Sequence, residues 1–120
     1  MLTVISTHYF YGRIRSEWVY YKAAKTYYDQ HQWAQARAYF EKSFAQGLNY
    51  PEAHLHLAHT YIELKDFQSA KQEYKAYLKI HPRDTATLRK YAATLIAVGE
   101  FEEAKQNYEK YFEIKKALQH

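Results

Sequence analysis

TYIELKDFQSAKQEYKAYLKIHP, residues 60–82, decides the fold of this 120-residue chain, because its landmarks recur at one fixed interval on both sides. Its Ala70 has counterparts 34 residues away in each direction, at Ala36 and Ala104. An aromatic side chain stands three residues before each alanine and another stands four residues after it: Trp33, Phe67 and Phe101, then Phe40, Tyr74 and Tyr108. A period of about 34 residues is typical of stacked pairs of helices. The sequence therefore predicts an all-α repeat fold.

Start and stop signals divide the repeats into three pairs of helices. Gly47 is a natural left-handed stop after a helix, and the fixed φ of Pro51 suits a first helical turn. Asp66 and Asp84 are expected N-caps, and Gly99 is expected at a tight turn. We expect helices at 17–30 and 33–46, at 51–64 and 67–80, and at 85–98 and 101–118.

Composition fits one small domain without disulfides. With 48% hydrophobic residues, the chain can bury a core, and the absence of cysteine excludes thiolate metal sites. Its 17 Lys and Arg are interleaved with 13 Asp and Glu, which argues against a dedicated nucleic-acid binder. The compartment stays open, with the cytoplasm slightly favoured and membrane attachment as the alternative.

The N-terminal lead-in, residues 1–16, lies outside the repeat pattern. Its apolar run is too short for a signal peptide or a membrane span, and no basic residue precedes it. One interpretation is a segment that packs on the first helix pair. Another is the end of a membrane helix, because apolar residues are followed by aromatic residues and then by Arg13 and Arg15.

Together, these positions resemble the tetratricopeptide repeat, with three repeats at 17–50, 51–84 and 85–118. The resemblance implies a right-handed α-α superhelix. A physical reason supports the pattern: two antiparallel helices approach closely only where their contact positions are small, as at Ala36, Ala70 and Ala104. Large side chains at spacings of three, four and seven then lie on one face of each helix.

Motifs that would indicate catalysis are missing from the sequence. There is no Gly-rich phosphate loop, no G-x-S-x-G and no H-E-x-x-H, so we expect no enzyme and no cofactor. His56 and His59 share a helix face, but no third metal ligand lies at a predictable position, and His54 is in the core phase. We therefore expect no metal site.

A row of lysines, Lys71, Lys75 and Lys79, recurs at a spacing of four. Such a row usually marks a solvated outer face, and that is the expectation here. The aromatic side chains nearby are in core phase, so they offer no platform for stacked bases. On this view, Lys71→Leu should be nearly neutral for stability.

Proteins of the resembled family bind partners on a concave surface lined by the first helix of each repeat. Carried over residue by residue, this groove consists of Trp18, Tyr21, Lys22, Lys25, Tyr28, Leu55, His56, His59, Ile62, Arg89, Lys90, Ala93 and Ile96. These positions are basic and aromatic, and none is acidic. We expect a non-catalytic protein-binding module whose ligand is an acidic peptide or helix with one or two aliphatic side chains.

Some members of that family grip the acidic C-terminal tails of chaperones with a fixed set of Lys, Asn and Arg. Tyr21, Lys25, His56 and Ala86 stand where Lys, Asn, Asn and Lys are expected. Only Lys90 is close to the expected Arg. The resemblance therefore does not extend to that ligand.

The alternative function is structural, with the array assembling with itself or within a larger repeat protein or membrane-anchored complex. Repeat arrays normally finish with a polar capping helix. Here the sequence leaves Phe112, Ile114 and Leu118 without a following helix. We expect this open end to be covered by a homodimer, by a crystal contact or by a C-terminal segment that the sequence lacks.

Overall fold

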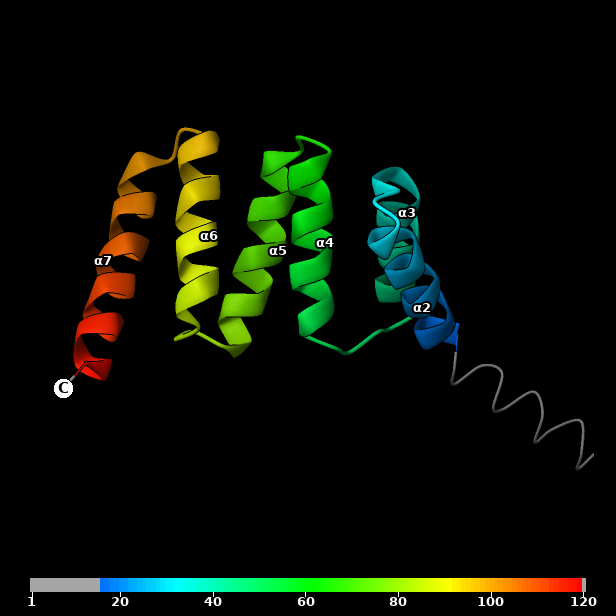
Figure 1. Ribbon diagram of the computed structural model, residues 1–120, viewed down its shortest axis with the longest axis horizontal. Helices are drawn as coiled ribbons and strands as arrows, with labels where there is room; N and C mark the ends of the chain where they lie inside the picture. Colours follow the sequence, from blue (N-terminus) through cyan, green and yellow to red (C-terminus); the bar gives the residue numbers. More distant parts are fainter. Residues whose placement is uncertain (1–15, 120) are drawn as a thin grey trace, which may run out of the picture. The chain divides into compact units, whose positions relative to one another are not determined.

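The computed structural model describes residues 16–119, and this part of the chain contains six helices and no strand (Figure 1). They are α2 (Ser16–Asp29), α3 (Trp33–Ala45), α4 (Glu52–Glu63), α5 (Phe67–Ile80), α6 (Thr85–Ala97) and α7 (Phe101–Leu118). Each end lies within one residue of its predicted position, so the all-α repeat fold is confirmed. Of the N-terminal lead-in, residues 1–15 lie outside the described residues, and so does the expectation about them. None of the described helices is long and apolar enough to cross a bilayer.

The turn inside each helix pair has the same backbone geometry at an interval of 34 residues. One residue of each turn has a positive φ: His31 at 57°, Lys65 at 64° and Gly99 at 83°. The next backbone N–H donates to a carbonyl of the preceding helix, from Gln32 to Tyr27, Asp66 to Tyr61 and Glu100 to Leu95, at 2.9, 2.8 and 2.8 Å. This hydrogen bond spans six residues and gives a partner to a carbonyl that the end of the helix would otherwise leave unpaired. The chain therefore reverses in the same way three times.

The first compact unit ends at Ala53, and in it α2 packs against α3. Ala24 and Ala36 are fully buried, as is Phe40. Tyr27 stacks on Tyr39, with ring centroids 5.5 Å apart and planes within 12°. Alanine at the contact positions lets the two helices approach, and the larger rings fill the space beside them.

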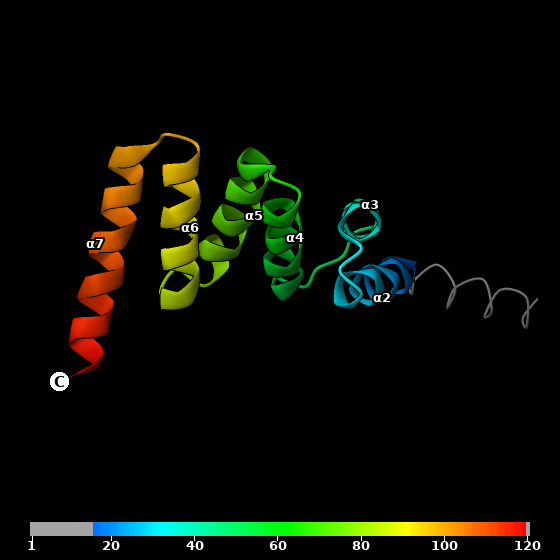
Figure 2. The same cartoon turned by 45° about the horizontal axis from the view of Figure 1, so that its top comes forward.

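The second compact unit begins at His54, and in it α6 packs against both α5 and α7. Figure 2 shows the same order of these helices from a second direction. The alanines of this unit's repeat pattern, Ala58, Ala70, Ala92 and Ala104, are buried. His54, expected in core phase, bonds through Nδ1 to Glu73 Oε1 at 2.7 Å and so joins α4 to α5.

Two polar contacts hold α6 and its following turn to neighbouring helices. The Tyr91 hydroxyl donates to Glu103 Oε1 at 2.8 Å, and burial raises the pKa of Tyr91, as does its bond to this carboxylate. Lys71 Nζ donates to Glu100 Oε1 at 2.6 Å, and only 14% of the Lys71 side chain is exposed. The expectation of a solvated Lys71 was wrong. The sequence row of lysines did not show that Glu100, 29 residues away, meets it in space.

The outer helix of the second unit also corrects one expectation about the open end. Phe112 and Leu118 are exposed, but Ile114 is buried. Ile114 follows Tyr111 by three residues and the buried Ala104 by ten, so it continues the inward stripe of α7. The exposed apolar surface therefore excludes Ile114.

Candidate functional site

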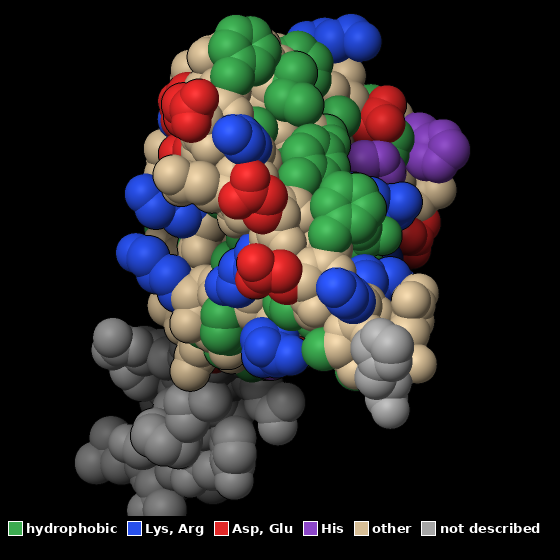
Figure 3. Space-filling model, turned by 90° about the vertical axis from the view of Figure 1, so that its left-hand side faces the viewer, with side chains coloured by type: hydrophobic (Ala, Val, Ile, Leu, Met, Phe, Trp, Pro, Cys, Tyr) green, Lys and Arg blue, Asp and Glu red, His purple; other side chains and the backbone are tan. Residues whose placement is uncertain are grey.

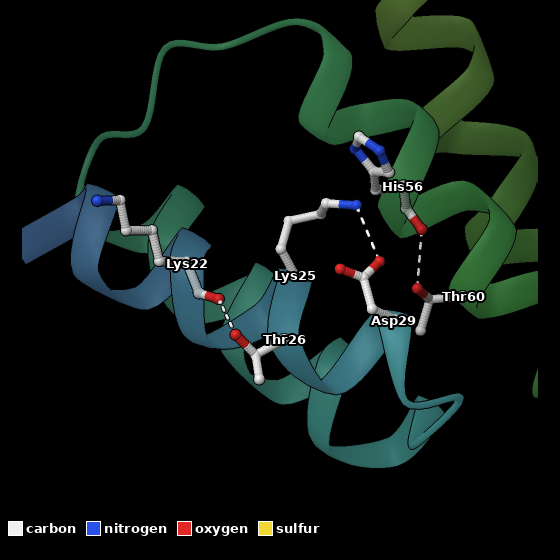
Figure 4. Close-up of polar contacts among 6 residues, drawn as sticks. All are labelled: Lys22, Lys25, Thr26, Asp29, His56 and Thr60. Carbon is white, nitrogen blue, oxygen red and sulfur yellow. Dashed lines mark hydrogen bonds and ion pairs between the residues drawn. The ribbon is translucent and has the colours of Figure 1, made fainter.

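The first helices of the three pairs share a threonine at one equivalent position. The hydroxyl groups of Thr26, Thr60 and Thr94 donate to the carbonyls of Lys22, His56 and Lys90, at 3.0, 2.8 and 2.8 Å. Figure 4 shows the first two of these bonds. Each threonine satisfies its hydroxyl within its own helix. Lys22, His56 and Lys90 therefore occupy the same repeat position, as the groove prediction requires.

A second repeated feature is a polar pair, a Lys or His beside a carboxylate, that the sequence analysis missed. Lys25 Nζ lies 3.2 Å from Asp29 Oδ1, as Figure 4 also shows, and His59 Nε2 lies 3.1 Å from Glu63 Oε1. Both pairs join residues four apart on one helix, and the second pair lies 34 residues after the first. The predicted groove positions thus have carboxylates beside them. The four-residue spacing between a Lys or His and an acidic residue was the signal that could have indicated them.

In the third repeat, alanines replace this polar pair. Ala93 and Ala97 stand at the positions of Lys25 and Asp29, 68 residues further on. Beside these alanines is a shallow pocket of about 260 Å³ in the second unit. It is lined by Ile62, Phe67, Tyr74, Lys90, Ala93, Thr94 and Ala97. The pocket is therefore open where the other two repeats carry longer polar side chains.

This pocket contains three of the predicted groove residues in the second unit, Ile62, Lys90 and Ala93. Its wall is mostly apolar, and Lys90 is the only cation that lines it. An aliphatic side chain could fill the space while a neighbouring carboxylate meets Lys90. Phe67 and Tyr74 were assigned to the core by the sequence analysis. Phe67 stays half-buried beside α6, whereas Tyr74, which is 5% exposed, presents little surface to the pocket.

The predicted groove residues of the first unit form an aromatic cluster on α2. The rings of Trp18 and Tyr21 each lie 5.4 Å from the ring of Tyr50. Tyr50 was not predicted, since it lies in a loop. Burial raises the pKa of Tyr21 to about 12, with further contributions from Tyr50, Glu52 and Asp29. The Tyr21 hydroxyl therefore stays protonated at neutral pH and can donate a hydrogen bond.

The remaining predicted residues differ in how accessible they are. Lys22 and Arg89 are exposed, whereas Leu55, His56 and His59 are half-buried. Lys25 Nζ also lies 4.9 Å from the ring centroid of Tyr28, in a cation–π contact. Ile96 lines a separate groove with residues of α7. Within residues 16–119, no group of three or more His, Cys, Asp or Glu side chains is placed to hold a metal ion.

Comparison with known proteins gives a family match and similar folds. A sequence profile of the tetratricopeptide repeat matches residues 27–86, whereas a search of curated protein sequences found no significant match. The chain is similar to the structure of YrrB, described as a TPR protein with an unusual peptide-binding site. Here the TM-score is 0.78 and the identity 19%, over 82% of this chain and 51% of that one.

Two further solved structures have a similar fold. One is the first TPR of Spaghetti (RPAP3) bound to the HSP90 peptide SRMEEVD, with TM-score 0.70 and 22% identity, over 85% of this chain and 81% of that one. The other is the crystal structure of MamA, with TM-score 0.73 and 18% identity, over 85% of this chain and 60% of that one. The chain thus spans about half of YrrB and 60% of this MamA chain.

Proposed function

Because the chain belongs to the tetratricopeptide repeat family, we propose that it is a non-catalytic module that binds a short segment of a protein partner. The match over residues 27–86 establishes the family. Two proteins of similar fold are described as having a peptide-binding site or a bound peptide, which supports this class of ligand. The first helices α2, α4 and α6 are the proposed binding elements.

The pocket beside Lys90 is the strongest support for the proposed function. It combines an apolar wall from Ile62, Phe67 and Tyr74 with one cation at its lining. A ligand that suits it has a Leu, Ile or Val side chain next to an Asp or Glu. Because Lys90 is exposed, its attraction for a carboxylate is screened by salt. The proposed affinity is therefore modest and weakens as ionic strength rises.

The aromatic cluster of the first unit is a second proposed contact surface. Trp18 and Tyr21 supply large rings, and the protonated Tyr21 hydroxyl can donate to a carbonyl or carboxylate. Lys25 attracts an acidic ligand less than the sequence suggested, because its charge is already paired with Asp29. The proposed ligand is therefore acidic near Lys90 and not along the whole set of predicted residues.

A peptide-display selection tests this function directly. We expect random 12-residue peptides selected on the full chain to be enriched in an acidic residue beside an aliphatic one. Lys90→Glu should weaken the selected peptides about tenfold at low salt, since it replaces an attraction by a repulsion. Ala97→Gln should also weaken them, because the longer side chain would fill the pocket.

Lys79→Glu, on the exposed side of α5, is the matched control for charge, and it should bind as the parent does. Melting temperatures should be nearly equal for the parent, Lys79→Glu and Lys90→Glu. Selected peptides without acidic enrichment, or an equal loss in both charge variants, would argue against the pocket as the binding site.

A further inference from the structure

A second apolar groove lies on the outer side of α7, away from the pocket beside Lys90. It has a volume of about 370 Å³ and is lined by Ile96, Phe101, Ala104, Lys105, Tyr108, Glu109 and Phe112. Figure 3 shows hydrophobic side chains gathered in a stripe on this side of the second unit. Phe101 is 65% exposed and Phe112 is 62% exposed. Such large exposed rings in one groove indicate a binding surface.

The groove has an occupied counterpart one repeat earlier. Moving its lining residues back by 34 positions gives Ile62, Phe67, Ala70, Lys71, Tyr74, Lys75 and Leu78. These residues of α4 and α5 form the surface beside which α6 lies, since Ile62, Phe67 and Tyr74 line one pocket with Ala93, Thr94 and Ala97. Tyr74 is 5% exposed there. α6 therefore covers this set of side chains in part, since Ile62 and Phe67 stay half-buried at the edge of the pocket, whereas their counterparts Ile96 and Phe101 are exposed.

The helix that occupies the earlier surface has a defined chemistry. α6 places the small side chains of Ala93, Thr94 and Ala97 beside the aromatic rings, where Thr94 is buried and the two alanines are exposed at the edge of the pocket. Small residues let a helix approach closely enough to bury flat rings. Glu100, six residues after Thr94, accepts the 2.6 Å bond from Lys71. A helix that packs on this type of surface therefore has an apolar face of small residues and one carboxylate.

The uncovered groove keeps the cation that the carboxylate would meet. Lys105 is the counterpart of Lys71, and it is exposed with no ion-pair partner among residues 16–119. One position differs in charge, since Glu109 stands where the earlier surface has Lys75. The edge of the groove therefore carries one positive and one negative group. It suits a helix of mixed charge whose carboxylate faces Lys105.

We propose that the groove on α7 binds an amphipathic helix of a partner protein, with Ala or Thr at spacings of three and four and a carboxylate placed against Lys105. A second copy of this chain fits less well. Its first helix would bring Lys25 and Asp29 to the positions of Ala93 and Ala97, and Gln32 to that of Glu100. Long charged side chains would then face the rings, and Lys105 would meet no carboxylate.

The chain itself supplies the probe for a test. A synthetic peptide of residues 84–101, DTATLRKYAATLIAVGEF, carries the small residues and the carboxylate of α6. We expect the labelled peptide to bind the full chain with one-to-one saturation in fluorescence anisotropy. Lys105→Glu should weaken binding at least fivefold, and a peptide with Glu100→Lys should recover it on that variant. Phe112→Ser should also weaken binding, because it removes apolar contact area.

Lys110→Glu, on an exposed part of the same helix outside the groove, should bind the peptide as the parent does. Equal binding by the Lys105 and Lys110 variants would overturn the proposal, because a peptide that displaced α6 from its own position would pair with Lys71 instead. A chain that dimerises, loses the dimer on Phe112→Ser and ignores the peptide would also overturn it, in favour of a second copy. Peptides that bind the pocket beside Lys90 should bind Lys105→Glu as tightly as they bind the parent. The experiments therefore test the two proposed binding surfaces independently.

Discussion

In each turn inside a helix pair, one residue with positive φ determines the free-energy cost of the backbone conformation. Left-handed backbone costs an ordinary residue roughly 1–2 kcal/mol relative to glycine, because its Cβ crowds the following carbonyl. Only the third turn has glycine, whereas His31 and Lys65 bear that cost in the first two. The three turns share one geometry but differ in strain.

This difference predicts opposite effects for two substitutions. Gly99→Ala should destabilise the chain by about 1 kcal/mol, since no atom crowds its added Cβ and only the backbone is strained. Lys65→Gly should stabilise it by roughly 0.5 kcal/mol, because relief of strain slightly exceeds the added entropy of the unfolded chain. Urea denaturation of the two variants measures both signs. Shifts in the same direction would show that the turns are not equivalent.

What the sequence missed at this scale were contacts between side chains far apart or in loops. Tyr50 joins Trp18 and Tyr21 from a loop that no helical pattern covers. Lys71 looked like part of a solvated row because Glu100 lies near it only after folding. Periodicity shows which side of a helix faces inward, but not which neighbour a long polar side chain reaches.

At the scale of helices, the small residues of the 34-residue pattern control how closely the elements approach. Ala70 is fully buried in α5. Ala70→Leu should cost about 1–3 kcal/mol of stability, because a larger side chain must separate the packed helices. Gln72→Leu, at an exposed position of the same helix, should change stability little. Thermal melts compare the two, and equal midpoints would contradict the assignment of Ala70 to a helix contact.

Helices were the part of the fold that the sequence could predict well. Their ends follow from local signals such as Asp66, whose carboxylate accepts from the Ser69 N–H at 3.1 Å, and Gly47, with a φ of 93°. Alanines and aromatic residues at 34-residue spacing fixed the pairing. The pocket beside Lys90 could not be predicted. Transferring groove positions from repeat to repeat assumes side chains of similar size, whereas Ala93 and Ala97 are shorter than the residues at the same positions of the other repeats.

At the scale of the molecule, the link between Lys71 and Glu100 predicts a pH dependence for the second unit. The hydrogen bond from Lys71 lowers the pKa of Glu100 below its ordinary value of 4.5, and nearby Lys75 adds to this effect. A carboxylate with a lowered folded-state pKa contributes stability above its unfolded-state pKa. That contribution is lost as the pH falls through the lowered value.

Lys71→Met should therefore be less stable than the parent at pH 7, and the difference should shrink as the pH falls below about 4. Denaturation at a series of pH values measures the difference in the free energy of unfolding. Lys79→Met serves as the control, because Lys79 is exposed and outside this link. A Lys71→Met difference that stays constant down to pH 2 would assign the loss of stability to packing of the lysine stem instead.

The same link has a mechanical consequence. α7 packs against α6 alone among the described helices, whereas α6 packs on both sides. Tension applied at the C-terminal end would peel α7 away one turn at a time. The peeling front would reach Glu100 last, where Lys71 anchors the turn to α5. Tension at the C-terminal end would therefore unwind α7 first, while the pocket beside Lys90 kept the side chains that line it.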